Sequence, residues 1–108
     1  MFCKGDIVQF DFSPSEGHEP QGRRPALVVS TDYFNTGTSM TLVCPITTTH
    51  NDFPLHRPLP KNLDTHGCIA LEQIRAFDLE ARHAQRIEHL RDQEFLSQIT
   101  ETLCSFLQ

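Results

Sequence analysis

The chain has 108 residues, 38% of them hydrophobic, which suits a single domain spanning residues 1–108 with one compact core. Its 14 acidic and 9 basic residues give a net charge of −5, which argues against broad coating of duplex DNA, because that binding neutralises many phosphates. A short basic cleft for a few nucleotides is compatible with this balance. No apolar run approaches the ~20 residues that a membrane span needs, and no signal peptide is recognised, so we expect a cytoplasmic protein.

Cysteine and histidine spacing argues against a metal site. The four cysteines, Cys3, Cys44, Cys68 and Cys104, form no C-x-x-C pair, and each lies among apolar neighbours. We expect them to be reduced and buried, as small hydrophobic residues in a reducing compartment. The six histidines form no H-x-H or H-x-x-x-H pair of the kind that zinc sites use. The sequence therefore predicts a protein that works without a metal or another cofactor.

The first half of the chain predicts three strands, at residues 7–12, 25–30 and 40–46. The first alternates in polarity, and the second is a continuous apolar run typical of a buried strand. Polar residues 15–23 form a loop between these two strands, and residues 47–52 have the polarity of a surface loop. Thr31 or Asp32 is placed to cap a short helical turn, which ends in a turn at residues 36–38.

The second half predicts short strands and then a helix. Strand-like segments occur at residues 55–57, 68–71, 73–77 and 84–87, with a turn at residues 78–80. The pattern then changes to helical spacing, with Asp92 placed as the N-cap and apolar residues at 95, 96, 99, 103, 106 and 107. Short strands followed by one helix predict a mainly β protein, a small and partly open β-barrel with a C-terminal α-helix.

Three polar segments carry the candidate chemistry. The first, residues 17–25, gathers one histidine, one glutamate and two arginines between two glycines, and Pro25 holds Arg24 in an extended conformation. The second, residues 45–49, follows a buried strand with hydroxyl side chains that donate either to a phosphate or to local turns. The third, residues 72–75, interrupts a strand region with charges. Taken alone, the first and third are also compatible with a solvated hairpin loop and a polar edge strand.

These segments resemble the MazF/PemK toxins over nearly the whole chain. The N-terminal signature is carried by Gly5-Asp6-Ile7-Val8, Asp11-Phe12-x-Pro14, Gly17-x-Glu19 and Gly22-x-Arg24-Pro25-Ala26. The second motif reads Val43-x-Pro45-x-Thr47-Thr48, and the third reads Glu72-Gln73-Ile74-Arg75-x-Phe77-Asp78. The resemblance implies a twisted, SH3-like β-barrel that forms a homodimer. It further implies an endoribonuclease toxin that cuts single-stranded messenger RNA at short motifs without a metal and so stops growth.

By position in these motifs, Arg24 matches the catalytic arginine and Thr47 the catalytic threonine. The chemistry suits both, because RNA is cut by its own 2′-hydroxyl and needs positioning, charge stabilisation and proton transfer from the protein. A guanidinium is a planar fork that matches phosphate, but it is a poor base near neutrality. His18 and Glu19 are the candidates for proton transfer. The resemblance also implies RNA-binding roles for Arg23, Thr48, Arg57, Glu72, Gln73 and Arg75.

The chain departs from both branches of the family. The PemK branch shares His18 but uses an arginine and an aspartate in R-x-D-Q, where this chain reads Ala70-Leu71-Glu72-Gln73. The MazF branch has a small residue in place of His18, and Pro20 replaces the usual glutamine of G-x-E-Q. The sequence therefore leaves open which residue is the general acid or base.

The resemblance also implies a partner, a small antitoxin whose disordered acidic tail lies across the RNA cleft. The basic residues nearest the motifs, Arg23, Arg24, Arg57 and Arg75, are expected to meet this tail. Two other functions fit a barrel of this kind, a gyrase poison of the CcdB type and a catalytically silent RNA- or protein-binding barrel. The first depends on a C-terminal tryptophan and lacks G-x-R-P, whereas this chain has no tryptophan.

Overall fold

The structure is a computed structural model that describes residues 1–14, 16–19, 21–48 and 53–108. The strands are β1 (Asp6–Asp11), β2 (Arg23–Val28), β3 (Thr41–Thr47), β4 (His56–Pro58), β5 (Cys68–Ala70), β6 (Arg75–Phe77) and β7 (Gln85–His89). The helices are α1 (Asp32–Thr38), the short 3₁₀ helix η1 (Leu71–Gln73) and α2 (Gln93–Ser105). The expected mainly β fold with a C-terminal α-helix is confirmed.

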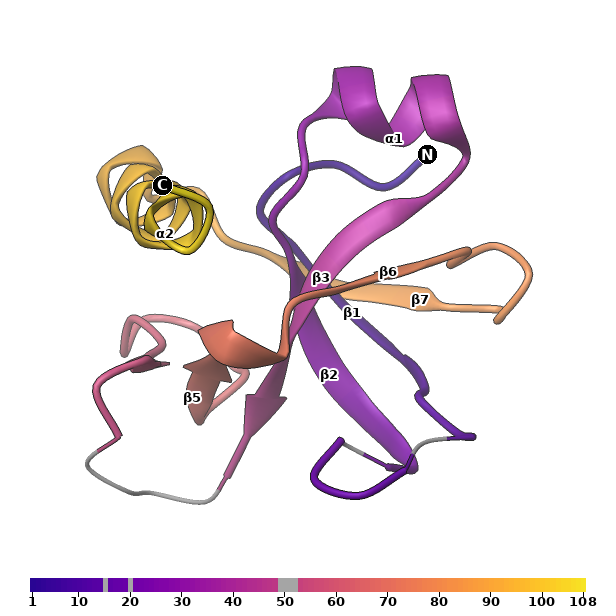
Figure 1. The fold of residues 1–108 in the computed structure, drawn as a ribbon, viewed down its shortest axis with the longest axis horizontal. Coiled ribbons are helices and arrows are strands. Elements are labelled where there is room, and N and C mark those ends of the chain that lie inside the picture. The colour runs from indigo at the N-terminus through magenta and orange to yellow at the C-terminus, as the bar shows by residue number, and fades with distance from the viewer. Residues whose placement is uncertain (15, 20, 49–52) are drawn as a thin grey trace.

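The strands form one curled antiparallel sheet in the order β4-β5-β3-β2-β1-β7, and β6 pairs with β3 beside this path. In the described residues β4 and β7 are not paired with each other, so the sheet is curled without closing into a barrel. Figure 1 shows α1 and α2 on separate sides of the sheet. The start of β2 and the end of β3 both lie at the end of the sheet far from α1 (Figure 1).

Strand β3 changes partner along one of its edges. Its first residues pair with β6, with Thr41 opposite Phe77, and its last residues pair with β5, with Thr47 opposite Cys68. The 3₁₀ helix η1 fills the step between these two partners, and the N–H of Ile74 donates to the carbonyl of Leu71 at 3.2 Å. This step explains why a single strand expected at residues 73–77 is replaced by η1 and the shorter β6.

Alternating side chains of the sheet supply two hydrophobic clusters. In β1, Ile7 joins the cluster that contains Leu96 and Ile99 of α2, whereas Val8 and Phe10 join the cluster on the opposite face. This is the two-residue period of a strand with both faces covered. In the second cluster Phe10 stacks on Phe12 with ring centroids 4.3 Å apart. The sheet is therefore buried on both faces, and polar side chains gather at its ends.

The two α-helices begin where their caps predict. The hydroxyl of Thr31 accepts from the N–H of Phe34 at 3.2 Å, and Asp92 Oδ1 accepts from the N–H of Phe95 at 3.0 Å. Helix α1 continues to Thr38, so the turn expected at residues 36–38 is wrong. The Thr38 hydroxyl donates to the Phe34 carbonyl at 2.8 Å, a local bond that fits the last turn of the helix.

Smaller corrections concern strand ends and cysteines. Thr47 is the last residue of β3 rather than the first of a loop, and residues 49–52 of that expected loop lie outside the described residues. All four cysteines are free, as expected, but Cys104 is exposed and Cys3 is only half-buried. Cys104 is exposed because it lies outside the row of Leu96, Ile99 and Leu103 that packs α2 against the core. Burial raises the pKa of Cys44 to about 12, so this thiol stays protonated.

Among the described residues, neither α-helix combines the length and the apolar character that crossing a membrane requires.

Glu88 on β7 links the sheet to the loop before β5. Its carboxylate accepts from the backbone N–H groups of Asp64 and Thr65, at 2.7 and 2.9 Å, and from the Thr65 hydroxyl at 2.8 Å. Partial burial raises the pKa of Glu88, but these three hydrogen bonds outweigh it and leave the pKa below its ordinary value. The ionised form is therefore the one that the fold stabilises.

We predict that Glu88→Gln lowers the melting temperature most at neutral pH. Because the folded pKa lies below the unfolded value, this stabilisation is present above the unfolded pKa of about 4.3 and is lost as pH falls through the folded pKa. The difference in melting temperature from the unmodified protein should therefore shrink between pH ~6 and pH ~3. Glu101→Gln, at an exposed position of α2, is the control. A Glu88→Gln effect that is constant with pH would contradict this account.

Candidate active site

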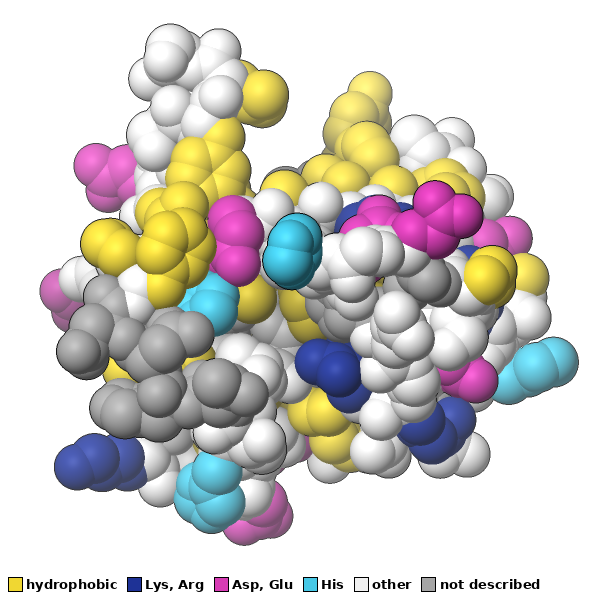
Figure 2. All heavy atoms as spheres, turned by 60° about the horizontal axis from the view of Figure 1, so that its bottom comes forward, with side chains coloured by type: hydrophobic (Ala, Val, Ile, Leu, Met, Phe, Trp, Pro, Cys, Tyr) yellow, Lys and Arg dark blue, Asp and Glu magenta, His cyan; other side chains and the backbone are white. Residues whose placement is uncertain are grey.

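A groove of about 630 Å³ lies at the end of the sheet where β2 begins and β3 ends. It is lined by His18, Glu19, Gln21, Arg24, Pro45, Thr47, His56, Ala70, Glu72 and Gln73. These residues come from the β1–β2 loop, from four strands and from η1. Figure 2 shows this face hollowed near its centre, with basic, acidic and histidine side chains around the hollow. The groove thus gathers residues from all three motifs.

Arg24 is held rigidly at the start of β2. It lies opposite Phe10 of β1 and directly before Pro25, which keeps its backbone extended. Its Nη2 donates to the carbonyl of Gln21 at 3.1 Å, and its Nε is buried without a hydrogen-bond partner in the described part of the chain. Arg24 is only partly buried and its guanidinium carries five N–H donors in a planar fork, so it is suited to a further acceptor such as a phosphate oxygen.

Thr47 is the last residue of the neighbouring strand, β3. The antiparallel pairing of β2 with β3 ends where Ala26 lies opposite Pro45, and Arg24 and Thr47 each lie two residues beyond that end. Both residues line the groove. Thr47 is half-buried and pairs with Cys68 on its other side. The two residues expected to contact phosphate therefore line one groove, just beyond the paired part of β2 and β3.

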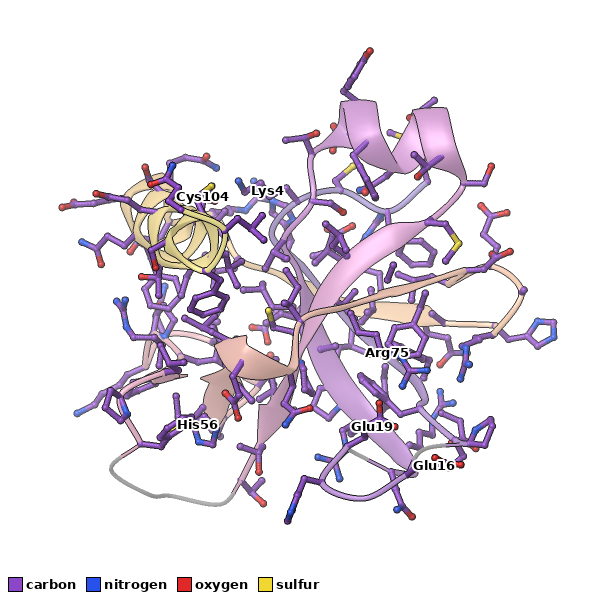
Figure 3. All side chains as sticks on the ribbon, viewed as in Figure 1. Lys4, Glu16, Glu19, His56, Arg75 and Cys104 are labelled. Carbon is purple, nitrogen blue, oxygen red and sulfur yellow. The ribbon has the colours of Figure 1, made fainter. Side chains whose placement is uncertain are left out.

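His18 and Glu19 enter the groove from the β1–β2 loop, and both are exposed. Glu19 Oε1 accepts from the N–H of Glu16 at 2.9 Å, and its Oε2 lies 3.8 Å from Nη1 of Arg75. Figure 3 shows Glu19 and Arg75 together on the β2 side of the groove. An exposed ion pair of this length contributes little stability, so Glu19 keeps freedom to contact a ligand.

His56, which sequence reasoning missed, lies on the other side of the groove beside β5 (Figure 3). Its Nε2 lies 2.9 Å from Oε2 of Glu72, and the two side chains are 11% and 27% exposed. β4 pairs with β5, setting His56 opposite Ala70, and this pairing brings two residues sixteen positions apart into contact. Nothing in the local sequence indicates that contact, because no sequence pattern links the short strand at His56 to the third motif at Glu72.

Four candidate residues lie outside this groove. Arg23 and Thr48 are exposed at strand ends, and Arg57 donates to Oε1 of Gln98 at 3.1 Å while lying over the ring of Phe95. Arg75 lies over Phe77, 4.8 Å from its ring centroid, and lines an adjoining pocket that also contains Glu19 and Glu72. Arg75 therefore extends the groove, whereas Arg57 faces α2.

No group of three or more potential metal-ligating side chains occurs among the described residues. The groove offers one rigid guanidinium, one hydroxyl, two carboxylates and two imidazoles. This set suits binding and proton transfer at a phosphodiester.

The family described as PemK-like, MazF-like toxin of type II toxin–antitoxin system matches residues 3–107. The chain belongs to this family. Endoribonuclease toxin ChpB of Escherichia coli (strain K12) is 46% identical over 94 residues, covering 80% of this chain and 78% of that protein.

Two solved structures extend this likeness to the fold. The crystal structure of MazF from Deinococcus radiodurans has a TM-score of 0.86 and 31% identity, covering 97% of this chain and 94% of that one. A MazE–MazF structure from the same organism has a TM-score of 0.81, with 31% identity and the same two coverages. The groove of this PemK/MazF-family chain thus lies in a fold already seen with a MazE partner in that relative.

Gly67 allows β5 to start close to Thr47. Its φ is +134°, and a Cβ at this position would lie 2.5 Å from the carbonyl oxygen of Thr47. A side chain there would be strained and would displace the end of β3. The position of Thr47 in the groove therefore depends on a glycine just before β5.

We predict that Gly67→Ala lowers the free energy of unfolding by about 1–3 kcal/mol, the range for forcing a side chain into a strained backbone conformation. Urea denaturation measures this loss. Gly37→Ala in α1 is the matched control, because its Cβ would meet nothing within 4 Å and alanine favours a helix. Equal stability of the two variants would show that Gly67 does not constrain the start of β5 beside Thr47.

Proposed function

We propose that this chain is an endoribonuclease toxin of a toxin–antitoxin pair that cleaves single-stranded RNA in the cytoplasm. The observation that carries the proposal is that Arg24 and Thr47 line one groove. The relative that is 46% identical is named an endoribonuclease toxin, which supports the same activity. A groove of about 630 Å³ suits a few unpaired nucleotides.

In the proposed reaction the 2′-oxygen of one ribose attacks the adjacent phosphorus, and the bond from phosphorus to the 5′-oxygen breaks. The 2′-hydroxyl gives up its proton, the departing 5′-oxygen gains one, and the products are a 2′,3′-cyclic phosphate and a 5′-hydroxyl. Arg24 stabilises the negative charge that grows on the phosphate oxygens, and Thr47 donates to one of them. His18 and Glu19 remain the candidates for proton transfer, since both line the groove with titratable groups.

We predict that Arg24→Ala reduces cleavage of an unstructured RNA by about 100- to 1000-fold, the usual effect of removing one transition-state donor. Arg24→Lys should recover little, because an ammonium does not reproduce the planar fork. Product mapping by gel, in excess chelator throughout, measures the rate and tests the expected independence from metal. Arg91→Ala, at an exposed arginine outside the groove, is the control and should retain most of the activity.

Near-original cleavage by Arg24→Ala would contradict this mechanism. Loss of activity in chelator, restored by magnesium or manganese, would contradict metal independence. RNA binding without any cleavage by the unmodified protein would instead favour the alternative of a catalytically silent RNA-binding protein.

We further infer an antitoxin partner whose acidic segment occupies the groove, and a homodimeric toxin. The MazE–MazF structure of the relative supports the first point, and Arg24 with the neighbouring Arg75 supplies the positive charge. The second is supported by large exposed apolar side chains in the described residues: Met1, Tyr33, Phe53, Ile87, Phe106 and Leu107. Such side chains are available for burial between two copies.

We predict that calorimetric titration with the neighbouring antitoxin shows weaker binding as salt rises, because contacts between opposite charges are screened. Light scattering of the toxin alone should show a dimer at both salt concentrations, because apolar contacts are insensitive to screening. Antitoxin that binds tightly but leaves RNA cleavage intact would overturn the proposed occupation of the groove.

A further inference from the structure

The two sides of the groove carry different chemistry. Arg24 and Thr47 lie on β2 and β3, whereas His56 belongs to β4 and Glu72 to η1. In the sheet order β3 and β5 separate β2 from β4, and Figure 3 shows His56 on the β5 side, away from Glu19. A phosphate held by Arg24 therefore leaves the His56 side to other parts of the nucleotide chain.

His56 has no nitrogen with which to contact a ligand directly. Its Nε2 lies 2.9 Å from Oε2 of Glu72, and its Nδ1 is buried without a hydrogen-bond partner among the described residues. The ring of Phe53 meets the imidazole edge-on, with centroids 5.2 Å apart. The contact with Glu72 and the burial of Nδ1 leave the ring no exposed nitrogen among the described residues. His56 therefore acts through Glu72.

Glu72 is an unsuitable contact for the RNA backbone, because its carboxylate repels phosphate. An ionised carboxylate is acceptor-only, and RNA offers it the ribose 2′-hydroxyl and the N–H groups of the bases, of which only the base N–H groups differ between nucleotides. Adenine, cytosine and guanine each carry an exocyclic amino group, whereas uracil presents one N–H between two carbonyl oxygens. A fixed carboxylate thus favours the first three over uracil. Gln73, next to Glu72 in the groove, adds an amide that both donates and accepts.

We propose that His56 is a positioning residue that holds Glu72 in the groove, and that Glu72 selects an amino-bearing base over uracil near the cleaved phosphate. This inference rests on the proposed ribonuclease function and adds a specificity determinant to it. Single-stranded RNA is recognised through base edges that are splayed into such grooves. Of the neighbouring charged groups, Arg75 pairs with Glu19 at 3.8 Å, which leaves His56 as the partner seen on Glu72 among the described residues.

The test is the base preference of cleavage. The protein cuts an unstructured RNA pool with random positions, and sequencing of the products gives the frequency of each base around the cut. We expect uracil to be disfavoured about tenfold at one position, within the range for one good contact between a side chain and a base edge. His56→Phe keeps the ring but removes the donor, and should reduce this discrimination to about twofold or less. Glu72→Gln, whose amide also donates to carbonyl oxygens, should accept uracil equally.

Two variants separate positioning from a structural effect. His56→Gln keeps an N–H donor and should restore much of the preference that His56→Phe loses. His66→Phe, at an exposed histidine outside the groove, should leave both rate and preference unchanged. Melting temperatures of all variants report folding. A His56→Phe protein that cuts all sequences more slowly by one common factor would overturn the inference, because that result indicates a structural role alone.

Base preference is also measured as the affinity for short oligonucleotides that differ in one base. Their 2′-hydroxyls are replaced by hydrogen, so that they cannot be cleaved. Weaker binding of the uracil-containing oligonucleotide, lost in His56→Phe, supports the inference even if no RNA is cut. Absence of cleavage by the unmodified protein counts against the proposed function alone. Equal affinity of the unmodified protein for all four bases at every position would overturn the role of Glu72.

Discussion

The site depends on the pairing of β3 with three other strands. One edge of β3 pairs with β2, while the other edge is divided between β6 near Thr41 and β5 near Thr47. Pro45 lies where this change occurs, and a proline has no N–H to continue a ladder of hydrogen bonds. The step between the two partners is occupied by η1, which carries Glu72 and Gln73. The groove therefore exists because one strand cannot keep a single partner along its length.

Burial of both faces of the sheet limits where polar chemistry can lie. The phenylalanine cluster fills one face, and α2 covers the other with Leu96 and Ile99. Charged side chains are costly inside such layers unless they are paired, so they gather at the ends of strands. Two groove residues illustrate this constraint. Arg24 is partly buried at the start of a strand and makes one bond to a carbonyl, and Glu72 is paired with His56. The geometry of the groove is thus a consequence of the core.

The agreement between sequence and structure is closest where the signal is local. The cap at Asp92, the apolar run of β2 and the end of β3 at Pro45 and Thr47 each depend on a few adjacent residues, and the structure places elements there within one or two positions. Arg24 and Thr47, which the motifs singled out, both line one groove in the structure. The expected turn after Asn35 was wrong because the helix is stabilised by contacts beyond it: the side-chain Nδ2 of Asn35 donates to the carbonyl of Phe2 at 2.9 Å.

The sequence alone determined the mainly β fold, the terminal helix, the family resemblance and the two residues expected to hold phosphate, because periodicity, caps and motif spacing are written along the chain. The tertiary structure decided which distant residues share a surface. The pairing of β4 with β5 brings His56 to Glu72, and the same strand turns Arg57 toward Gln98 on α2. Adjacent residues of a strand point to opposite faces, so one position of register separates a groove residue from a helix contact, and local sequence does not fix that register.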